Sequence, residues 1–411
     1  MMDMISTLPD DILCHVLSFL KTKQAVATSI LSKRWKHLWL SVPVLDFSRT
    51  RVTDQEANFR FHDFVYSVLL SRDSAPPVKF FRLYVMYNYT QHVNLIMPSV
   101  SKWINFVLQR GGLEYLDLYM DTSGWPTLPI NILSCTTLVA LKLCFFRVVD
   151  HRFSSVLLLP SLKTLHLHLI RFAKRQDFMF LLAACPNLED LLISALLFDD
   201  EEDSLSCNEW KNFSLSNLTK ANVDSYYFQF PMKVLHNVQS LSMCIAKAHC
   251  FNDAIPTFHN LTCMHLESLN NRCHFIVEVF KHCPKLQELY VDEDGMNSDY
   301  QPWTKKDDKE NWVDPNFVPQ CLSLHLRVFC FSSVFGLQGE LQLARYILKN
   351  ARVLQTMRIS TIGEPEIKDL LSSFPRASSS CKLTFVYLPR DYSSESDSSL
   401  DANETSIGSD A

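Results

Sequence analysis

The sequence has little glycine. Only 8 of its 411 residues are glycine, whereas glycine makes up about 7% of an average protein. Glycine-rich loops that hold phosphates are therefore hard to place in this chain. The patterns G-x-S-x-G, G-x-x-x-x-G-K-[ST] and H-E-x-x-H, which mark common hydrolase, nucleotide-binding and zinc-protease sites, are also missing. These absences predict a protein that is not an enzyme.

An excess of positive charge is missing as well. The chain has 39 Lys and Arg against 44 Asp and Glu, a formal net charge of -5. Because little positive charge is left to neutralise phosphates, no nucleic-acid partner is expected. The 13 cysteines include no C-x-x-C pair, which argues against a disulfide framework or a zinc finger and favours a reducing compartment.

The sequence also lacks a signal-peptide pattern and an uninterrupted membrane span. The first residues, MMDMIST, carry an acid and no basic segment. The uncharged stretch from Thr122 to Leu141 contains Pro126 and Pro129, which is typical of loops and strand ends rather than of a transmembrane helix. We therefore expect a protein of the nucleus or the cytoplasm with no membrane partner.

The N-terminal segment has the spacing of an amphipathic helix. The apolar residues of LPDDILCHVLSFL, from Leu8 to Leu20, recur at helical intervals, and Asp10 and Asp11 suit the start of a helix. A second helix is expected after Thr22 and a third after Ser32, with each of these residues as N-cap. Three helices this short bury little apolar surface among themselves. The unit is expected to bind a partner; packing against the protein's own first repeat is the alternative.

The middle of the chain repeats the pattern L-x-x-L-x-L. Its copies begin at Leu113, Leu138, Leu162, Leu188, Val238, Leu261 and Leu286, with a weaker copy at Leu218. Successive copies start 20 to 30 residues apart, which is the period of leucine-rich repeats. Each copy supplies a strand and a return segment that are buried only by stacking on their neighbours. The pattern predicts an α/β fold, an irregular leucine-rich-repeat solenoid.

Side chains between the repeat leucines should point away from the core, because residues alternate faces along a strand. These positions are candidate target-binding residues, and an ordinary solvated surface is the alternative for any one of them. The set is Tyr115, Asp117, Tyr119, Lys142, His166, His168, Asn222, Asp224, His265, Glu267, Glu288 and Tyr290. His166 with His168, and Cys263 with His265, share a face, but zinc needs three or four convergent ligands. No metal and no cofactor are expected.

The sequence pattern changes in the C-terminal third of the chain. A strand pattern, LSLHLRVFCF, is followed by a helix over 340–350 and a further repeat-like strand, LQTMRI, and the serine-rich acidic end is expected to be disordered. The predicted organisation is 1–47 for the helical unit, 48–110 for a connecting segment, 111–295 for the repeats, 296–311 for a polar loop, 312–388 for a C-terminal domain and 389–411 for the tail.

Two segments carry a family resemblance. The stretch ISTLPDDILCHVLSFLKTKQAVATSILSKRWKHLW resembles the F-box, and WVDPNFVPQCLSLHLRVFCFSSVFGLQGELQLARYILKNARVLQTMRI, from Trp312 to Ile359, resembles the FBD domain. Together with the repeats, they resemble the F-box/FBD/leucine-rich-repeat family known chiefly from plants. One departure is Lys21, where that family usually has proline. Without a turn proline, the free energy of unfolding should be lower by about 0.5 to 1 kcal/mol, because the unfolded chain is less restricted.

The resemblance implies a non-catalytic subunit of an SCF-type (Skp–cullin–F-box) ubiquitin ligase. In that family the F-box docks on a Skp-type adaptor, and through it on a cullin scaffold, while the remainder captures a target protein for ubiquitination. The implied adaptor-binding residues, some of which must face inward, are Leu8, Pro9, Ile12, Leu13, Leu17, Val26, Leu31, Ser32 and Trp35. The FBD-like segment is expected to cap the solenoid or to bind a partner.

Two other hypotheses remain at this stage. The chain could be a repeat scaffold for protein interactions with no role in ubiquitination, or a repeat protein that senses a small ligand, as the resemblance allows. A bound small ligand would raise the melting temperature of the purified protein. The identity of the target is not encoded in these patterns.

Overall fold

The computed structural model describes residues 5–72, 74–87, 93–122, 124–149, 157–199, 213–224, 230, 232–244, 255–267, 273–292, 312–361 and 366–387. The polar loop predicted over 296–311 and the tail predicted over 389–411 lie outside these residues. The chain divides into two compact units, Met1–Cys263 and Met264–Ala411. Each unit is an α/β structure, and the predicted fold class is confirmed.

The first unit begins with three short helices, α1 (Asp10–Leu17), α2 (Thr22–Ala27) and α3 (Trp35–Ser41). Single 3-10 turns at Ile5–Thr7 and Thr28–Ile30 accompany them. Their shared core is Leu13, Leu17, Ala25, Trp35, Leu38 and Val42.

The predicted helix caps were wrong in detail. Lys21, not Thr22, precedes α2, and its backbone N–H donates to Gln24 Oε1 at 3.2 Å. Thr22 is buried, and its hydroxyl oxygen accepts from the Asp46 backbone N–H at 2.8 Å. Arg34 rather than Ser32 precedes α3. The Thr22 side chain therefore links α2 to the first strand instead of capping the start of the helix.

Parallel strands follow in the first unit. They are β1 (Val44–Val52), β2 (Phe80–Tyr87), β3 (Tyr115–Asp121), β4 (Ala140–Val148), β5 (Thr164–Phe172), β6 (Asp190–Ser194), β8 (Lys220–Asp224) and β9 (Ser240–Cys244). They pair in that order, and β7 (Leu197–Phe198) pairs with β5. Because consecutive strands are neighbours, equivalent positions of successive repeats form rows across the sheet.

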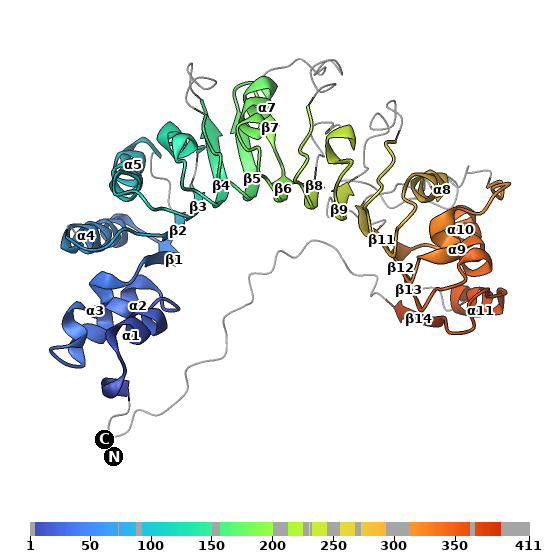
Figure 1. The fold of residues 1–411 in the computed structure, drawn as a ribbon, viewed down its shortest axis with the longest axis horizontal. Helices are drawn as coiled ribbons and strands as arrows, with labels where there is room; N and C mark the ends of the chain where they lie inside the picture. Colours follow the sequence, from blue (N-terminus) through green and yellow to red (C-terminus); the bar gives the residue numbers. More distant parts are fainter. Residues whose placement is uncertain are drawn as a thin grey trace. The chain divides into compact units, whose positions relative to one another are not determined.

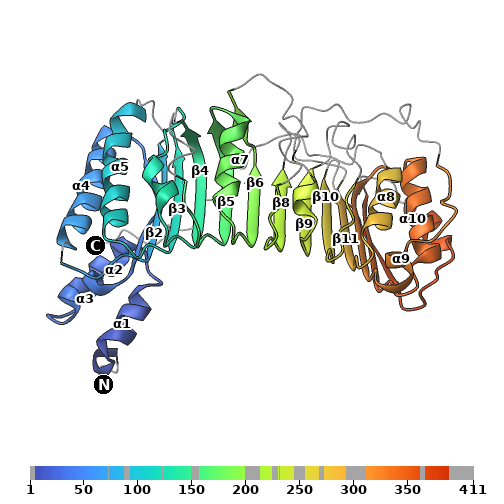
Figure 2. The same cartoon turned by 45° about the horizontal axis from the view of Figure 1, so that its top comes forward.

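Helices and turns cover one face of this sheet. They are α4 (Gln55–Ser71), α5 (Val93–Gln109), α7 (Arg175–Ala183) and the 3-10 turns Ile130–Ser134 and Met232–Leu235. Figure 1 shows α4, α5 and α7 on the same side of the strands, and Figure 2 shows α4 and α5 side by side. The covered face holds the buried side chains, as the alternating burial of β2 and β3 shows. The other face is called the open face below.

The second unit repeats this construction. Its strands are β10 (Cys263–Glu267), β11 (Glu288–Asp292), β12 (Val328–Val334), β13 (Thr356–Thr361) and β14 (Lys382–Tyr387), and β11 to β14 pair in parallel. Its helices are α8 (Cys273–His282), α9 (Gln320–Leu324), α10 (Gln338–Asn350) and α11 (Glu366–Ser373). The buried Glu340 carboxylate accepts from the backbone N–H of Phe335 at 3.1 Å and of Leu337 at 2.7 Å, which fixes the turn that starts α10.

Two regularities recur from repeat to repeat. Non-glycine residues with left-handed backbone occupy the same place after the strand start: Phe145 (φ 64), Leu169 (φ 49), Ala195 (φ 52) and Ser333 (φ 59). Asparagines directly before the repeat leucine form a series of side-chain hydrogen bonds in the first unit: Asn187 to Pro160 O, Asn217 to Pro186 O, Asn237 to Ser216 O and Asn260 to Asn237 Oδ1. The left-handed residues and the asparagines thus recur with the repeat, as its leucines do.

Candidate functional site

The first candidate surface lies on the N-terminal helices. Of the predicted adaptor-binding residues, Leu13, Leu17 and Trp35 are only 0%, 1% and 7% exposed. They form the core of the three-helix unit and are therefore among the predicted residues that face inward. The others remain accessible at the surface: Leu8, Pro9, Ile12, Leu31 and Ser32 are exposed, and Val26 is half-buried.

Sequence reasoning missed four exposed apolar residues of the same unit. They are Ile5, Val16, Phe19 and Ile30, and Phe19 and Ile30 are 77% and 86% exposed. Ile5, Leu8, Ile12, Val16 and Phe19 follow one another at helical spacing, beside the buried stripe of α1. We call Ile5, Leu8, Ile12, Val16, Phe19, Ile30 and Leu31 the exposed helical face. Exposed large apolar side chains gathered on so small a unit are typical of binding sites.

Polar contacts shape this face. The Arg34 guanidinium donates to Asp10 Oδ1 at 2.8 Å through Nε and also donates to the carbonyl oxygen of Leu8. It thereby joins the beginnings of α1 and α3. Lys21 has φ -61, which is close to the value that proline would impose, so the backbone at this position has a conformation that proline could also adopt.

A buried arginine joins the helices to the repeats. Arg72, which follows α4, is 1% exposed and donates to the carbonyl oxygen of Trp39 at 3.0 Å. Its own carbonyl accepts from Arg110 at 2.6 Å. Burial, and then the positive charge of Arg110, lowers the pKa of Arg72 to about 10, so the side chain stays charged near neutral pH. The hydrogen bond to Trp39 fixes the end of α3 on the first repeat.

The second candidate surface is the open face of the first unit. Strand register aligns its residues in rows: Asp117, Lys142 and His166 are direct neighbours, and so are Tyr119, Cys144 and His168. Asn222 and Asp224 continue these rows on β8. The structure thus brings together eight of the predicted target-binding residues: Tyr115, Asp117, Tyr119, Lys142, His166, His168, Asn222 and Asp224. All are half-buried or exposed.

The remaining four predicted target-binding residues belong to the second unit. The Tyr290 hydroxyl donates to Glu288 Oε2 at 3.0 Å, and the rings of His265 and Tyr290 lie 6.0 Å apart. His265 Nδ1 lies 3.9 Å from the Glu267 carboxylate. These side chains form a smaller polar group of their own.

Charges on the open face of the first unit are largely paired. Arg82, which sequence reasoning missed, lies 3.2 Å from Asp46 and 3.0 Å from Asp117. His166 Nε2 lies 3.5 Å from Asp190. Burial, and then Lys142, lowers the pKa of His166, so its imidazole is neutral near pH 7. Negative and positive side chains therefore alternate along the row of Asp46, Arg82, Asp117 and Lys142, with no strong excess of either charge.

Aromatic rings gather on the same face. Phe80 stacks on Tyr115 at 4.3 Å, and Tyr84 stacks on Tyr119 at 3.9 Å between ring centroids. Phe80 and Tyr84 come from β2, whose sequence FFRLYVMY alternates but does not match the repeat pattern. Alternation alone could have identified them.

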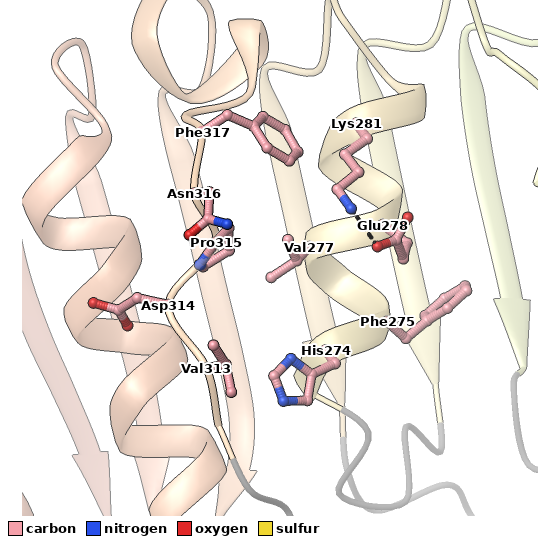
Figure 3. A pocket seen from close by; sticks show the side chains of 10 residues that line it. All are labelled: His274, Phe275, Val277, Glu278, Lys281, Val313, Asp314, Pro315, Asn316 and Phe317. Carbon is pink, nitrogen blue, oxygen red and sulfur yellow. Dashed lines mark hydrogen bonds and ion pairs between the residues drawn. The ribbon is translucent and has the colours of Figure 1, made fainter.

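A groove in the second unit is a weaker candidate (Figure 3). It runs between α8 and the extended segment before α9, and His274, Val277, Val313 and Phe317 contribute to its walls. The Lys281 ammonium forms an ion pair with Glu278 at 2.5 Å and lies 5.0 Å from the Phe317 ring centroid. The basic group at this groove is thus already engaged.

The described part of the chain offers neither a metal site nor a membrane span. Within it, no group of three or more His, Cys, Asp or Glu side chains is arranged to hold a metal ion. No helix in the same residues is long and apolar enough to cross a membrane. The exposed helical face and the open face remain as the two surfaces with a clear chemical character.

Comparison with known proteins assigns the segments that carry these surfaces to known domains. A family model for the F-box domain matches residues 5–47, and one for the FBD matches residues 314–359. A third, described as the LRR repeats of the FBD-associated F-box protein At5g56370, matches residues 100–219. The fold and its surfaces therefore define an F-box protein with leucine-rich repeats and an FBD.

Curated relatives extend over nearly the whole chain. The F-box/FBD/LRR-repeat protein At4g26340 of Arabidopsis thaliana is 29% identical over 93% of this chain and 100% of its own length. The FBD-associated F-box protein At5g56820 of the same plant is 30% identical over 93% of this chain and 94% of its own. This chain belongs to the family of F-box/FBD/LRR-repeat proteins.

Proposed function

We propose that the protein is the substrate-recognition subunit of an SCF-type ubiquitin ligase. The observation that carries the proposal is the exposed helical face, because it lies on the F-box, and F-box proteins generally act as substrate adaptors. Ile12 and Leu31 are 47% and 62% exposed although both are strongly apolar. A Skp-type adaptor that lays a helix on this face would remove that apolar area from water.

The repeats would supply the second half of the function. The open face carries aromatic and paired polar side chains on a stacked parallel sheet, which is a surface suited to a protein partner. The chain itself would do no chemistry. It would hold the target near a ubiquitin-conjugating enzyme that the cullin scaffold brings, and so raise the effective concentration of the two reactants.

The test compares ubiquitin conjugation on captured proteins. The wild-type chain and an Ile12→Glu, Leu31→Glu double variant are expressed in plant cells, and the ubiquitin content of the proteins bound to each is measured. We expect both chains to capture the same proteins, with ubiquitin attached to them only in the wild type. A Phe59→Glu variant is the matched control, because Phe59 is apolar and 72% exposed on α4, away from the exposed helical face. Equal conjugation with the wild type and the double variant would contradict the proposal.

A further inference from the structure

The last strand of the second unit has an unpaired edge. β14 pairs in parallel with β13 on one side and stands last in the order of strands, and no further strand of the described residues pairs with it (Figure 1). The first strand of the first unit differs, because the backbone N–H of Asp46 on β1 donates to the Thr22 hydroxyl oxygen of α2. An uncovered edge presents backbone donors and acceptors with which another strand can pair.

The hydrogen bonds to β13 determine which backbone groups of β14 face this edge. The N–H of Lys382 donates to the carbonyl oxygen of Gln355 at 2.8 Å, toward β13. Successive residues of a strand direct their N–H and C=O groups to opposite sides. The even-numbered residues of β14 therefore bond to β13, and the odd-numbered ones face the unpaired edge. We call these odd-numbered residues the edge residues; they are Leu383, Phe385 and Tyr387.

The apolar side chains of the edge residues are incompletely covered. Strand register places Leu383 beside Met357 and Phe385 beside Ile359 on the covered face. Met357 and Ile359 are only 0% and 1% exposed, whereas Leu383 and Phe385 are half-buried and Tyr387 is 50% exposed. The core of the covered face is therefore open at its last strand. A further strand with apolar side chains would close it by removing that area from water.

The pattern of β14 is complementary to itself. In an antiparallel pair with a two-fold axis at Phe385, every edge residue lies opposite an edge residue of the second copy and exchanges backbone hydrogen bonds with it. Leu383 then lies opposite Tyr387, so that apolar side chains meet on the covered face. On the open face, Thr384 lies opposite Val386, and both residues favour strands.

Charge is compatible with the same pairing. Lys382 is the only charged residue of β14, and the two-fold axis does not place it opposite the lysine of the second copy. The C-terminal residues 389–411 are a poorer match to this edge, because they are rich in serine and acids. Their only large apolar residues are Tyr392, Leu400 and Ile407, which provide no alternating apolar row. A second β14 matches both the backbone groups and the side chains of the edge.

We propose that the protein forms a dimer in which β14 pairs antiparallel with β14 of a second copy, about a two-fold axis at Phe385. Such a dimer holds two copies of every binding surface, so a partner with two binding segments is held more tightly than by one chain. The inference is independent of the proposed function, because the pairing needs neither an adaptor nor a target.

Sedimentation equilibrium of the purified full chain over a wide range of concentration tests the proposal. We expect the mass to rise with concentration from 47.5 kDa, the mass of one chain, to twice that value. Thr384→Lys, Val386→Lys places lysine opposite lysine and should raise the dimer dissociation constant about tenfold or more. Thr384→Glu, Val386→Lys places opposite charges at the same positions and should retain the dimer.

Val313→Lys is the control for added charge, because Val313 is 71% exposed in the extended segment before α9, and it should leave the dissociation constant unchanged. Thermal melting of every variant identifies misfolding. A monomeric wild type overturns the inference, and a dimer that then forms when residues 389–411 are removed would assign the edge to the tail. A folded dimer that the two lysines do not weaken, or that both charge variants weaken equally, overturns the pairing at β14.

Discussion

At the scale of single residues, a half-buried histidine, His62, is expected to make the stability of this protein depend on pH. His62 lies on α4 with its ring 4.9 Å from that of Trp103, and its Nε2 has no hydrogen-bond partner among the residues that the structure describes. Burial lowers the pKa of His62 from 6.5, so the folded state binds the proton less readily than the unfolded state. The stability that neutral His62 provides is therefore present above about pH 6.5 and is lost as the pH falls through that value.

We expect the urea midpoint of the wild type to fall between about pH 7.5 and about pH 5.5, and to fall less in His62→Gln. His37→Gln is the control, because His37 is exposed and should keep the wild-type slope. His166 and His168, whose pKa values are also lowered by burial, add to the same dependence. A His62→Gln variant with the full wild-type slope would show that this ring is not the group responsible.

At the scale of elements, the asparagine series predicts a measurable contribution to repeat stacking. Asn217 Nδ2 donates to the carbonyl oxygen of Pro186 at 3.2 Å. Because the bond is partly accessible to water, Asn217→Ala should lower the free energy of unfolding by about 1 kcal/mol. Asn316→Ala, at an exposed position of the second unit, should change it by less than about 0.5 kcal/mol. Equal effects of the two substitutions in urea titrations would refute a stacking role for Asn217.

The repeats could be predicted because their leucines recur in every copy. Two features could not be predicted: the first two strands and the hydrogen bonds of the asparagine series. β1 and β2 do not carry the pattern L-x-x-L-x-L, so the sheet begins at Val44 rather than near Leu113. The asparagines before the repeat leucines were visible in the sequence, yet their hydrogen bonds became evident only when successive repeats were stacked. A periodic signal thus locates a solenoid better than it locates the end of one.

The candidate surfaces were predicted to different degrees for physical reasons. Tyr119 and His166 follow from strand alternation, since each lies between buried neighbours. Phe145 does not, because a left-handed residue interrupts the alternation there. On the helices, a stripe of leucines has the same composition whether it faces its own core or a partner. For that reason Leu13 and Leu17 could not be told from Ile12 before burial was known.

At the scale of the whole molecule, the proposed function requires a firm junction between the F-box and the repeats, because the junction would hold a target in place relative to the adaptor. Arg72 supplies that junction through its hydrogen bond to Trp39 O. Arg72→Met would leave this carbonyl and that of Pro76 without their donor. We expect the free energy of unfolding to fall by about 2 to 3 kcal/mol, because hydrogen bonds to charged groups contribute more than neutral ones.

The control for the junction, Arg60, lies on α4, the helix that Arg72 directly follows. Arg60 pairs with Glu56 at 2.7 Å, but both side chains are largely exposed, so Arg60→Met should cost less than about 1 kcal/mol. Chemical denaturation of the full chain compares the two. An Arg72→Met protein as stable as Arg60→Met would mean that the buried guanidinium does not hold the F-box in place.

Binding of a Skp-type adaptor to the exposed helical face can be measured by isothermal titration of the purified full chain with such an adaptor. The wild type and Phe59→Glu should bind with dissociation constants within about twofold of each other, whereas Ile12→Glu, Leu31→Glu should weaken binding by about a hundredfold or more. No binding by the wild type, or undiminished binding by the double variant, would contradict the account.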